Sequence, residues 1–256
     1  TTTSTCPGMD GTGTSGDYYR IDDCCQLEFV MDSPNSYYML DASIDCSTQN
    51  SLNNGTTIDP IGSSGIPFTG VFDGDNRAIT NLAITANSSY AGLFGYSTGT
   101  IRDLNVYGIV EGGSYTGGIA GYSSAGLTSC LFNGSVTGGG YVGGIVGSKS
   151  GGSLSGSSAY GTVRGSGSRA GGIAGSSSGA TFSNNVFAGT VSGSNRVGGI
   201  VGDNSGGSIS SCSAGTQVNG GQYVGGIAGY SSSADFDSCS FTGFVNATGG
   251  NAGGIT

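Results

Sequence analysis

A block of two glycines and an isoleucine recurs through most of the chain at a nearly constant spacing. Its second residue falls every 26 to 28 positions, starting from the variant Ala91-Gly92-Leu93. The later blocks are centred on Gly118, Gly144, Gly172, Gly199, Gly226 and Gly254. Self-similarity at such a period is the signature of a stacked repeat architecture, in which one repeat is one structural unit.

Apolar residues keep the same phase as this glycine block. One column holds Val110, Val136, Val163, Val191, Val218 and Val245, and another holds Ile101, Leu127, Leu154, Phe182, Ile209 and Phe236. Each apolar stretch is short and alternates with polar residues, which is typical of a strand with one buried face. Gly and Ser are poor helix formers. We therefore predict an all-β, right-handed parallel β-solenoid, whose turns stack at ~4.8 Å and whose corners are formed by glycines with positive φ.

The segment before the repeats extends the pattern. Residues 77–84 align with residues 99–106, so Ile79, Leu82 and Ile84 are expected to form an earlier rung. Upstream of this rung the composition becomes more acidic and richer in cysteine. We therefore divide the chain into a cap, residues 1–57, and a solenoid, residues 58–256, which form one continuous structural unit.

The cap is predicted to contain the single short helix of the chain. Asp22 or Asp23 can serve as its N-cap, and Leu27, Val30 and Met31 give it an apolar face. Strands are expected at residues 37–40 and 43–46. This arrangement would cover the first turn of the solenoid.

Four of the seven cysteines lie in the cap, and four cysteines permit three pairings. We expect two disulfides, one joining Cys24 or Cys25 to Cys46 and the other joining the remaining one of the two to Cys6. Each would contribute ~2–4 kcal/mol to a cap with a small core.

Two more cysteines, Cys212 and Cys239, lie one turn apart in the same column. A spacing of ~4.8 Å between stacked turns is within disulfide reach. The alternative is a ladder of buried thiols acting as small apolar groups. Cys130 is three turns from Cys212 and too far away to pair with it.

Charge and hydropathy exclude some partners. The chain has 7 Lys and Arg against 16 Asp and Glu, for a net charge of −9, and contains no His. Phosphate contacts need clustered Lys and Arg, so nucleic-acid binding is not expected. No stretch approaches the ~18 apolar residues of a membrane span.

Several features favour an extracellular or cell-surface protein. Seven cysteines in a chain rich in Gly, Ser and Thr fit an oxidising compartment. The chain opens on Thr1, and we expect that a secretion signal has been removed from it. Glycosylation sequons occur at Asn54, Asn87, Asn133 and Asn246.

The lead-in to the repeats carries a family resemblance. Ile58-Asp59-Pro60-Ile61-Gly62, then Phe68 to Gly74, then Ile79-Thr80-Asn81-Leu82 resemble the opening segment of GLUG repeats, the Gly-rich repeats of large secreted and surface proteins that include some immunoglobulin A peptidases. The position of Ile58 is usually aromatic in that family. The resemblance covers roughly residues 37–256 and implies a β-solenoid in extracellular use. It also implies that the repeats flank or carry other activities, and it transfers no catalytic residue.

The chain offers little for catalysis. Without His no Ser–His or Cys–His nucleophile pair can form. Asp235 and Asp237 share a strand face, but neighbouring turns place no acid in their columns. Asp73 and Asp75 fit turn chemistry or a weak Ca²⁺ site. We therefore expect no catalytic residue, cofactor or metal, and we expect the protein not to be an enzyme.

Aromatic and basic residues recur at two positions beside the glycine block. Just before it come Tyr115, Tyr141, Arg169, Arg196 and Tyr223, and after it come Tyr96, Tyr122 and Tyr230. Exposed rows of Tyr and Arg suit contact with glycans or proteins. Packing at a corner of the solenoid would use the same residues, so both interpretations stay open.

Three functions follow as hypotheses. Residues 251–256 begin a turn without a polar cap, and an open solenoid end invites another chain. The first hypothesis is therefore an extracellular filament or appendage subunit that assembles head to tail with itself through its ends, without catalysis. The second is an adhesin stalk that binds surface proteins or glycans, and the third is a carbohydrate-active enzyme.

Overall fold

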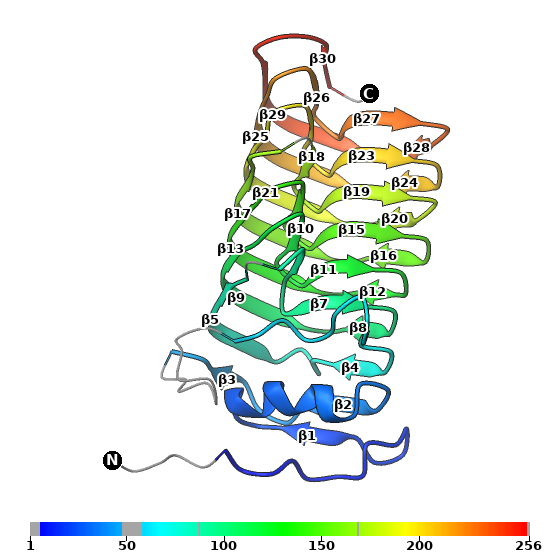
Figure 1. The fold of residues 1–256 in the computed structure, drawn as a ribbon. Coiled ribbons are helices and arrows are strands. Elements are labelled where there is room, and N and C mark those ends of the chain that lie inside the picture. Colours follow the sequence, from blue (N-terminus) through cyan, green and yellow to red (C-terminus); the bar gives the residue numbers. More distant parts are fainter. Residues whose placement is uncertain (1–5, 48–57, 87, 168, 255–256) are drawn as a thin grey trace.

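The computed structural model describes residues 6–47, 58–86, 88–167 and 169–254, which form a parallel β-solenoid (Figure 1). Successive turns stack from the N-terminal end to the C-terminal end, and four parallel sheets run along the stack. The fold class predicted from the 27-residue period is confirmed.

Two of the sheets contribute more buried apolar residues than the other two. The nine-stranded sheet consists, in order, of β1 (Tyr19–Ile21), β2 (Tyr37–Leu40), β4 (Val71–Asp73), β8 (Thr100–Arg102), β12 (Leu127–Thr128), β16 (Ser153–Ser155), β20 (Thr181–Ser183), β24 (Ser208–Ser210) and β28 (Asp235–Asp237). The eight-stranded sheet consists of β3 (Ile44–Asp45), β5 (Ala78–Thr85), β9 (Asn105–Glu111), β13 (Leu131–Gly138), β17 (Ser158–Gly165), β21 (Val186–Ser192), β25 (Ser213–Gly220) and β29 (Ser240–Ala247).

The other two sheets flank the Gly-Gly-Ile block. The seven-stranded sheet consists of β6 (Tyr90–Ala91), β10 (Tyr115–Gly117), β14 (Tyr141–Gly143), β18 (Arg169–Gly171), β22 (Arg196–Gly198), β26 (Tyr223–Gly225) and β30 (Ala252–Gly253). The six-stranded sheet consists of β7 (Phe94–Ser97), β11 (Ala120–Ser123), β15 (Val146–Ser150), β19 (Ala174–Ser178), β23 (Val201–Ser205) and β27 (Ala228–Ser232).

The register places each apolar residue on its counterpart in the next turn. Val136 pairs with Val110 on one side and with Val163 on the other, and all three are buried. Leu154 lies between Leu127 and Phe182 in the same way. Complete burial of one such side chain contributes ~1.5–3 kcal/mol relative to leaving it in water. One turn cannot bury its apolar face alone, so the stack is the stable unit.

Glycines form one set of corners as predicted, where Gly151, Gly152, Gly179, Gly206 and Gly207 have φ between 63° and 83°, and elsewhere they allow close approach of the backbone. A Cβ on Gly144 would lie 2.2 Å from the carbonyl oxygen of Gly172 in the next turn, so the block admits no side chain there. At a second repeated corner Gly156 has a positive φ of 60°, but Asp103, Ser129, Asn184, Ser211 and Ser238 also adopt positive φ there, with values between 51° and 55°. Short polar side chains tolerate this region better than most residues do, and our expectation that glycine forms the corners is wrong at these positions.

One predicted alignment at the start of the solenoid is also wrong. Ile79 pairs with Val106 and Ile84 pairs with Val110, while Phe72 takes the place beneath Ile101. The register shifts between Ile79 and Leu82, where the strand is irregular. The similar sequences of residues 77–84 and 99–106 therefore lie at different positions within their turns.

The cap lies on the first turns and shares their sheets, as Figure 1 shows. Its helix is a 3₁₀ helix, η1 (Cys24–Asp32), with Asp23 as N-cap and Gln26 completing a capping box. Leu27 and Val30 face the core as predicted, and Met31 is only partly buried. The predicted strands at residues 37–40 and 43–46 correspond to β2 and β3.

The two cap disulfides match the predicted pairing. Cys6 bonds Cys25 with a Cα–Cα distance of 5.8 Å, and Cys24 bonds Cys46 with a Cα–Cα distance of 5.4 Å. They tie both ends of the described cap to the start of η1.

Candidate functional site

Tyrosine and arginine side chains line up in two parallel rows along the solenoid. Row one lies on the outer side of the seven-stranded sheet and consists of Tyr90, Tyr115, Tyr141, Arg169, Arg196 and Tyr223, which are paired in register. Row two lies on the six-stranded sheet and consists of Tyr96, Tyr122, Ser148, Ser176, Asp203 and Tyr230. The five residues predicted for surface contact, Tyr115, Tyr141, Arg169, Arg196 and Tyr223, all belong to row one.

The two rows converge because the chain folds tightly between the two sheets. A Cβ on Gly147 would lie 2.6 Å from the backbone nitrogen of Thr116, and one on Gly175 would lie 2.4 Å from that of Val142. Only glycine fits here, so the outer surfaces of the two sheets meet at a narrow corner. Side chains of both rows therefore emerge side by side, and we call this surface the tyrosine–arginine face.

The N-terminal part of the tyrosine–arginine face is aromatic. The rings of Tyr90, Tyr115 and Tyr141 stack with centroids 4.9 and 4.8 Å apart, and the rings of Tyr96 and Tyr122 stack at 4.2 Å. Tyr90 also meets Tyr96 edge to face at 5.1 Å, which joins the two rows. Stacked and edge-to-face pairs contribute ~0.5–1.5 kcal/mol each beyond their burial.

The C-terminal part is charged. Nε of Arg169 and Nη1 of Arg196 both donate to Oδ2 of Asp203, whose side chain is 11% exposed. The Arg169 guanidinium lies 4.7 Å from the centre of the Tyr141 ring, and that of Arg196 lies 4.2 Å from the Tyr230 ring. Both contacts are within cation–π range. Two guanidinium groups against one carboxylate leave this cluster with a charge of +1.

The hydroxyls of Tyr96 and Tyr115 stay protonated at neutral pH. Burial, followed by the neighbouring tyrosines, raises the pKa of Tyr115 above its usual value of 10.0. Burial and contact with Tyr122 raise the pKa of Tyr96 in the same direction. Both groups therefore offer a neutral O–H that donates and accepts hydrogen bonds.

Sequence reasoning missed three features of this face. Tyr90 is the first member of row one, and the variant block Ala91-Gly92-Leu93 after it was a usable signal. Asp203 occupies the tyrosine position of row two, where its bridge to two arginines was not foreseen. Ser148 and Ser176 share that position, and only the paired rows reveal that they interrupt an aromatic stack.

A hollow of about 490 Å³ adjoins the cap end of row one. Its lining includes Pro60, Gly62, Ser63, Thr85 and Tyr90. It extends the polar and aromatic surface of the face toward the start of the solenoid.

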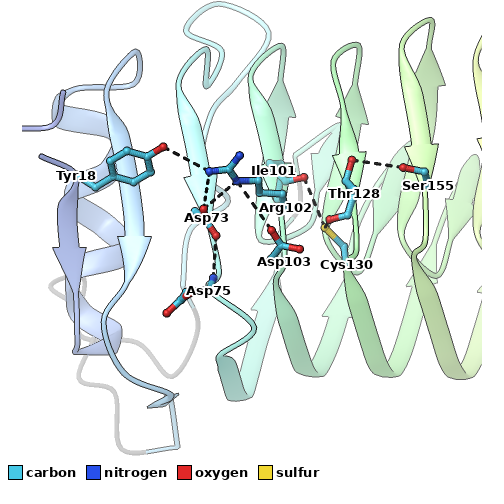
Figure 2. Close-up of polar contacts among 9 residues, drawn as sticks. All are labelled: Tyr18, Asp73, Asp75, Ile101, Arg102, Asp103, Thr128, Cys130 and Ser155. Atoms are coloured by element: carbon cyan, nitrogen blue, oxygen red, sulfur yellow. Dashed lines mark hydrogen bonds and ion pairs between the residues drawn. The ribbon is translucent and has the colours of Figure 1, made fainter. Parts of the chain in front are cut away.

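A second polar cluster joins the cap to the solenoid (Figure 2). Arg102 donates from Nε to Oδ2 of Asp73 at 2.8 Å and from Nη2 to the hydroxyl of Tyr18 at 3.5 Å. The Asp73 carboxylate also accepts from the backbone N–H of Asp75 at 2.9 Å. Asp73 and Asp75 thus make the predicted turn contact, and the arginine holds Asp73 in an ion pair, which favours a structural role for this cluster.

The predicted bond between Cys212 and Cys239 does not form. Both thiols are free, as is that of Cys130. Cys212 donates to the carbonyl of Ser210, and Cys239 donates to that of Ile209. The alternative interpretation as a thiol ladder holds for the buried Cys130 and Cys212. Burial raises the pKa of Cys130 to about 12, so it stays a thiol.

The remaining candidate positions are distributed over the surface. Asn133 and Asn246 lie exposed on β13 and β29, and their glycosylation stays a prediction, while Asn54 and Asn87 lie outside the described residues. Within the described ranges no three His, Cys, Asp or Glu side chains gather into a metal site. Nor does any helix in those ranges have the length and apolarity to cross a membrane.

Known proteins share this fold and part of this sequence. No family model matches the chain. A stretch of halomucin from Haloquadratum walsbyi (strain DSM 16790 / HBSQ001) is 33% identical over 142 aligned positions, which cover 40% of this chain and 2% of halomucin.

Two solved structures resemble the whole solenoid. One is a Bacteroides ovatus protein provisionally named an immunoglobulin A1 protease, with a TM-score of 0.73, 20% identity, and coverage of 96% of this chain and 86% of that one. The other is named IgA1 protease, with a TM-score of 0.59, 17% identity, and coverage of 91% of this chain and 21% of that one. Identities this low show the fold alone.

These findings correct one expectation. We predicted that the protein is not an enzyme, yet the two solved structures described above carry the name of a protease. The prediction rested on side chains within one solenoid, and the chain spans only 21% of the second of these proteins. Side chains of a solenoid do not decide whether the protein that carries it is catalytic, so the prediction is withdrawn.

Proposed function

We propose that this chain is a binding module of a secreted or cell-surface protein and that its tyrosine–arginine face holds a glycan. The observation that carries the proposal is the convergence of two side-chain rows into one aromatic and cationic surface about six turns long. A periodic surface matches a ligand that is itself a repeating chain.

The extracellular part of the proposal rests on chemistry and on resemblance. Two disulfides in the cap fit an oxidising compartment. The likeness to GLUG repeats, which stays a proposal, points to secreted and surface proteins. The matched stretch is 2% of halomucin, so similar repeats also occur within a very long chain.

The glycan part rests on the side chains of the face. Sugars present both C–H faces and hydroxyl groups, so they need flat apolar surfaces beside hydrogen-bonding groups. Tyrosine supplies both from one rigid side chain, and the serines and arginines of the rows add further donors. Stacking within row one covers most ring faces, so the hydroxyl ends of Tyr115 and Tyr141 are the groups offered to a ligand there.

A polysaccharide panel tests the proposal. The full chain is measured against immobilised acidic and neutral polysaccharides, alone and as the double variant Tyr115→Ala/Tyr141→Ala. We expect the double variant to bind at least tenfold more weakly, and ~1.4 kcal/mol corresponds to tenfold. The same mixtures are examined for shortening of the polysaccharide, which tests the third hypothesis, a carbohydrate-active enzyme.

The control uses two tyrosines that are more exposed and lie on another face. Tyr107 and Tyr160 lie on the outer side of the eight-stranded sheet and are 38% and 37% exposed. The variant Tyr107→Ala/Tyr160→Ala is expected to bind within twofold of the unaltered chain. Absence of binding to every polysaccharide, or equal losses in both double variants, would reject the proposal.

Head-to-tail assembly into a filament stays a prediction. The prediction rests on the last turn of the chain. Electron microscopy of concentrated protein tests it directly, because dispersed single particles would contradict assembly.

A further inference from the structure

Row two contains a gap between its aromatic and its charged parts. Tyr122 pairs in register with Ser148, which pairs with Ser176, which in turn pairs with Asp203. Both serines are partly exposed. Three turns separate Tyr122 from Asp203, or ~14 Å along the solenoid. We call the surface over Ser148 and Ser176 the serine gap.

The Tyr122 ring forms one end of the serine gap, and the face of this ring toward Ser148 is available for stacking. Tyr122 stacks on Tyr96 at 4.2 Å with an angle of 17° between the ring planes. Its next neighbour in row two is a serine, whose side chain is too short to cover the opposite face. A six-membered ring placed over Ser148 would continue the stack by one turn, at a spacing close to ~4.8 Å.

The side and the far end of the serine gap carry positive charge. Arg169 runs along its side, with its guanidinium 4.7 Å from the Tyr141 ring at one end and bonded to Asp203 at the other. Asp203 shares one oxygen between Arg169 and Arg196. A guanidinium has five N–H donors, so the two arginines retain donors for an added carboxylate. The net charge of +1 favours an anionic ligand.

We propose that the serine gap binds one acidic pyranose residue, a uronic acid, within a glycan. Its ring lies on Tyr122, its hydroxyls bond Ser148 and Ser176, and its carboxylate faces Arg169. This inference rests on the proposed glycan-binding function and adds the class of sugar and its position. Carboxylate–guanidinium pairs are strong and directional, which fixes the orientation of the sugar.

Titration calorimetry with defined oligosaccharides tests the inference. Hexamers of galacturonate and of glucuronate are compared with neutral cellohexaose, each against the full chain. We expect at least one acidic hexamer to bind tenfold or more tightly than the neutral one and to weaken as salt is raised. Arg169→Gln is expected to bring acidic binding down to the neutral level, and Arg169→Lys to restore part of it.

A steric variant provides the second arm. Ser148→Tyr would extend the Tyr96–Tyr122 stack into the gap and is expected to weaken acidic binding at least tenfold. Ser155→Tyr introduces the same ring at a partly exposed serine of the nine-stranded sheet and is expected to change binding less than twofold. Thermal unfolding checks that each variant is folded. If Arg169→Gln does not fold, the result for Ser148→Tyr alone tests the inference.

The outcomes separate the two proposals. Equal affinity for acidic and neutral hexamers, or equal binding by Ser148→Tyr and Ser155→Tyr, would overturn the acidic subsite while leaving glycan binding by the face intact. If the unaltered chain binds none of the hexamers and no polysaccharide, both proposals fail.

Discussion

The cap and the solenoid are stabilised in different ways. In the cap, few contacts repeat, and two disulfides hold a 3₁₀ helix and short strands together. In the solenoid, three free cysteines form no cross-link, and each turn is held to the next by hydrogen bonds between parallel strands. Covalent bonds are used where stacking cannot supply enough buried area, as in small disulfide-rich domains.

The difference implies that damage spreads differently in the two regions. A solenoid behaves as a one-dimensional stack in which each turn contacts its neighbours. A substitution that destabilises one turn should therefore destabilise the adjacent turns most. Loss of a cap disulfide should instead loosen the cap as a unit.

The largest effect is expected from a cavity within the stack. Phe182 is fully buried between Leu154 and Ile209. Phe182→Ala should lower the free energy of unfolding by about 3–5 kcal/mol. Hydrogen exchange should show the greatest loss of protection in β16, β20 and β24, whereas a loss spread evenly to β1 and β2 would contradict the one-dimensional picture. Ser155→Ala, on the surface of β16, serves as the control.

The next largest effect is expected in the cap. Cys24→Ser/Cys46→Ser removes a cross-link over 22 positions and should cost about 2–4 kcal/mol. Hydrogen exchange in β1, η1 and β2 should accelerate, while β13 and β17 keep their protection. Cys212→Ala, which removes an uncross-linked thiol, should leave cap exchange unchanged. Equal loosening of both regions would show that the cap stabilises the whole stack.

A pH-dependent effect is expected inside the stack. Lys149 is fully buried, with its Nζ bonded to the carbonyls of Ala125 and Gly151 at 2.6 and 2.7 Å. Burial lowers its pKa from 10.5 to about 8. Above pH 8 the folded chain releases a proton that the unfolded chain keeps until about 10.5, so the free energy of unfolding should rise with pH in that window.

The full rise across this window is about 3 kcal/mol, because a pKa difference of one corresponds to ~1.4 kcal/mol. Urea unfolding at pH 7.5, 8.5 and 9.5 measures it as the difference between the unaltered chain and Lys149→Met. Taking this difference cancels the titration of the tyrosines. A difference that is constant across these pH values would show that Lys149 remains charged.

The smallest effect is expected at the joint between the two regions. Arg102 is 42% exposed and its partner Asp73 is 12% exposed. Arg102→Gln should cost about 0.5–1 kcal/mol, since half-exposed ion pairs are screened by solvent. Exchange should rise in β1 and β2 alone. Arg20→Gln, which removes the more exposed pair with Asp41, should change exchange less.

The sequence by itself determined the period, the parallel stack and which cysteines cross-link the cap. The repeat has 26 to 28 residues, with valine and isoleucine in phase. Such a repeat buries its apolar side chains when each one stacks on the equivalent residue of the next turn. The order of the cysteines predicted that Cys24 and Cys25 bond Cys6 and Cys46, and the structure decides that Cys25 takes Cys6 and Cys24 takes Cys46. These features follow from local order along the chain.

The tertiary structure alone decided how different columns meet. The period says which residues stack, but the angle of the corner at Gly147 and Gly175 determines that row one and row two lie side by side. That angle brings Asp203 between two arginines and leaves the serine gap beside them. The tertiary structure also shows that Cys212 and Cys239, one turn apart, donate to backbone carbonyls rather than bonding each other. Lateral distances and side-chain directions depend on packing across turns, which a linear repeat does not encode.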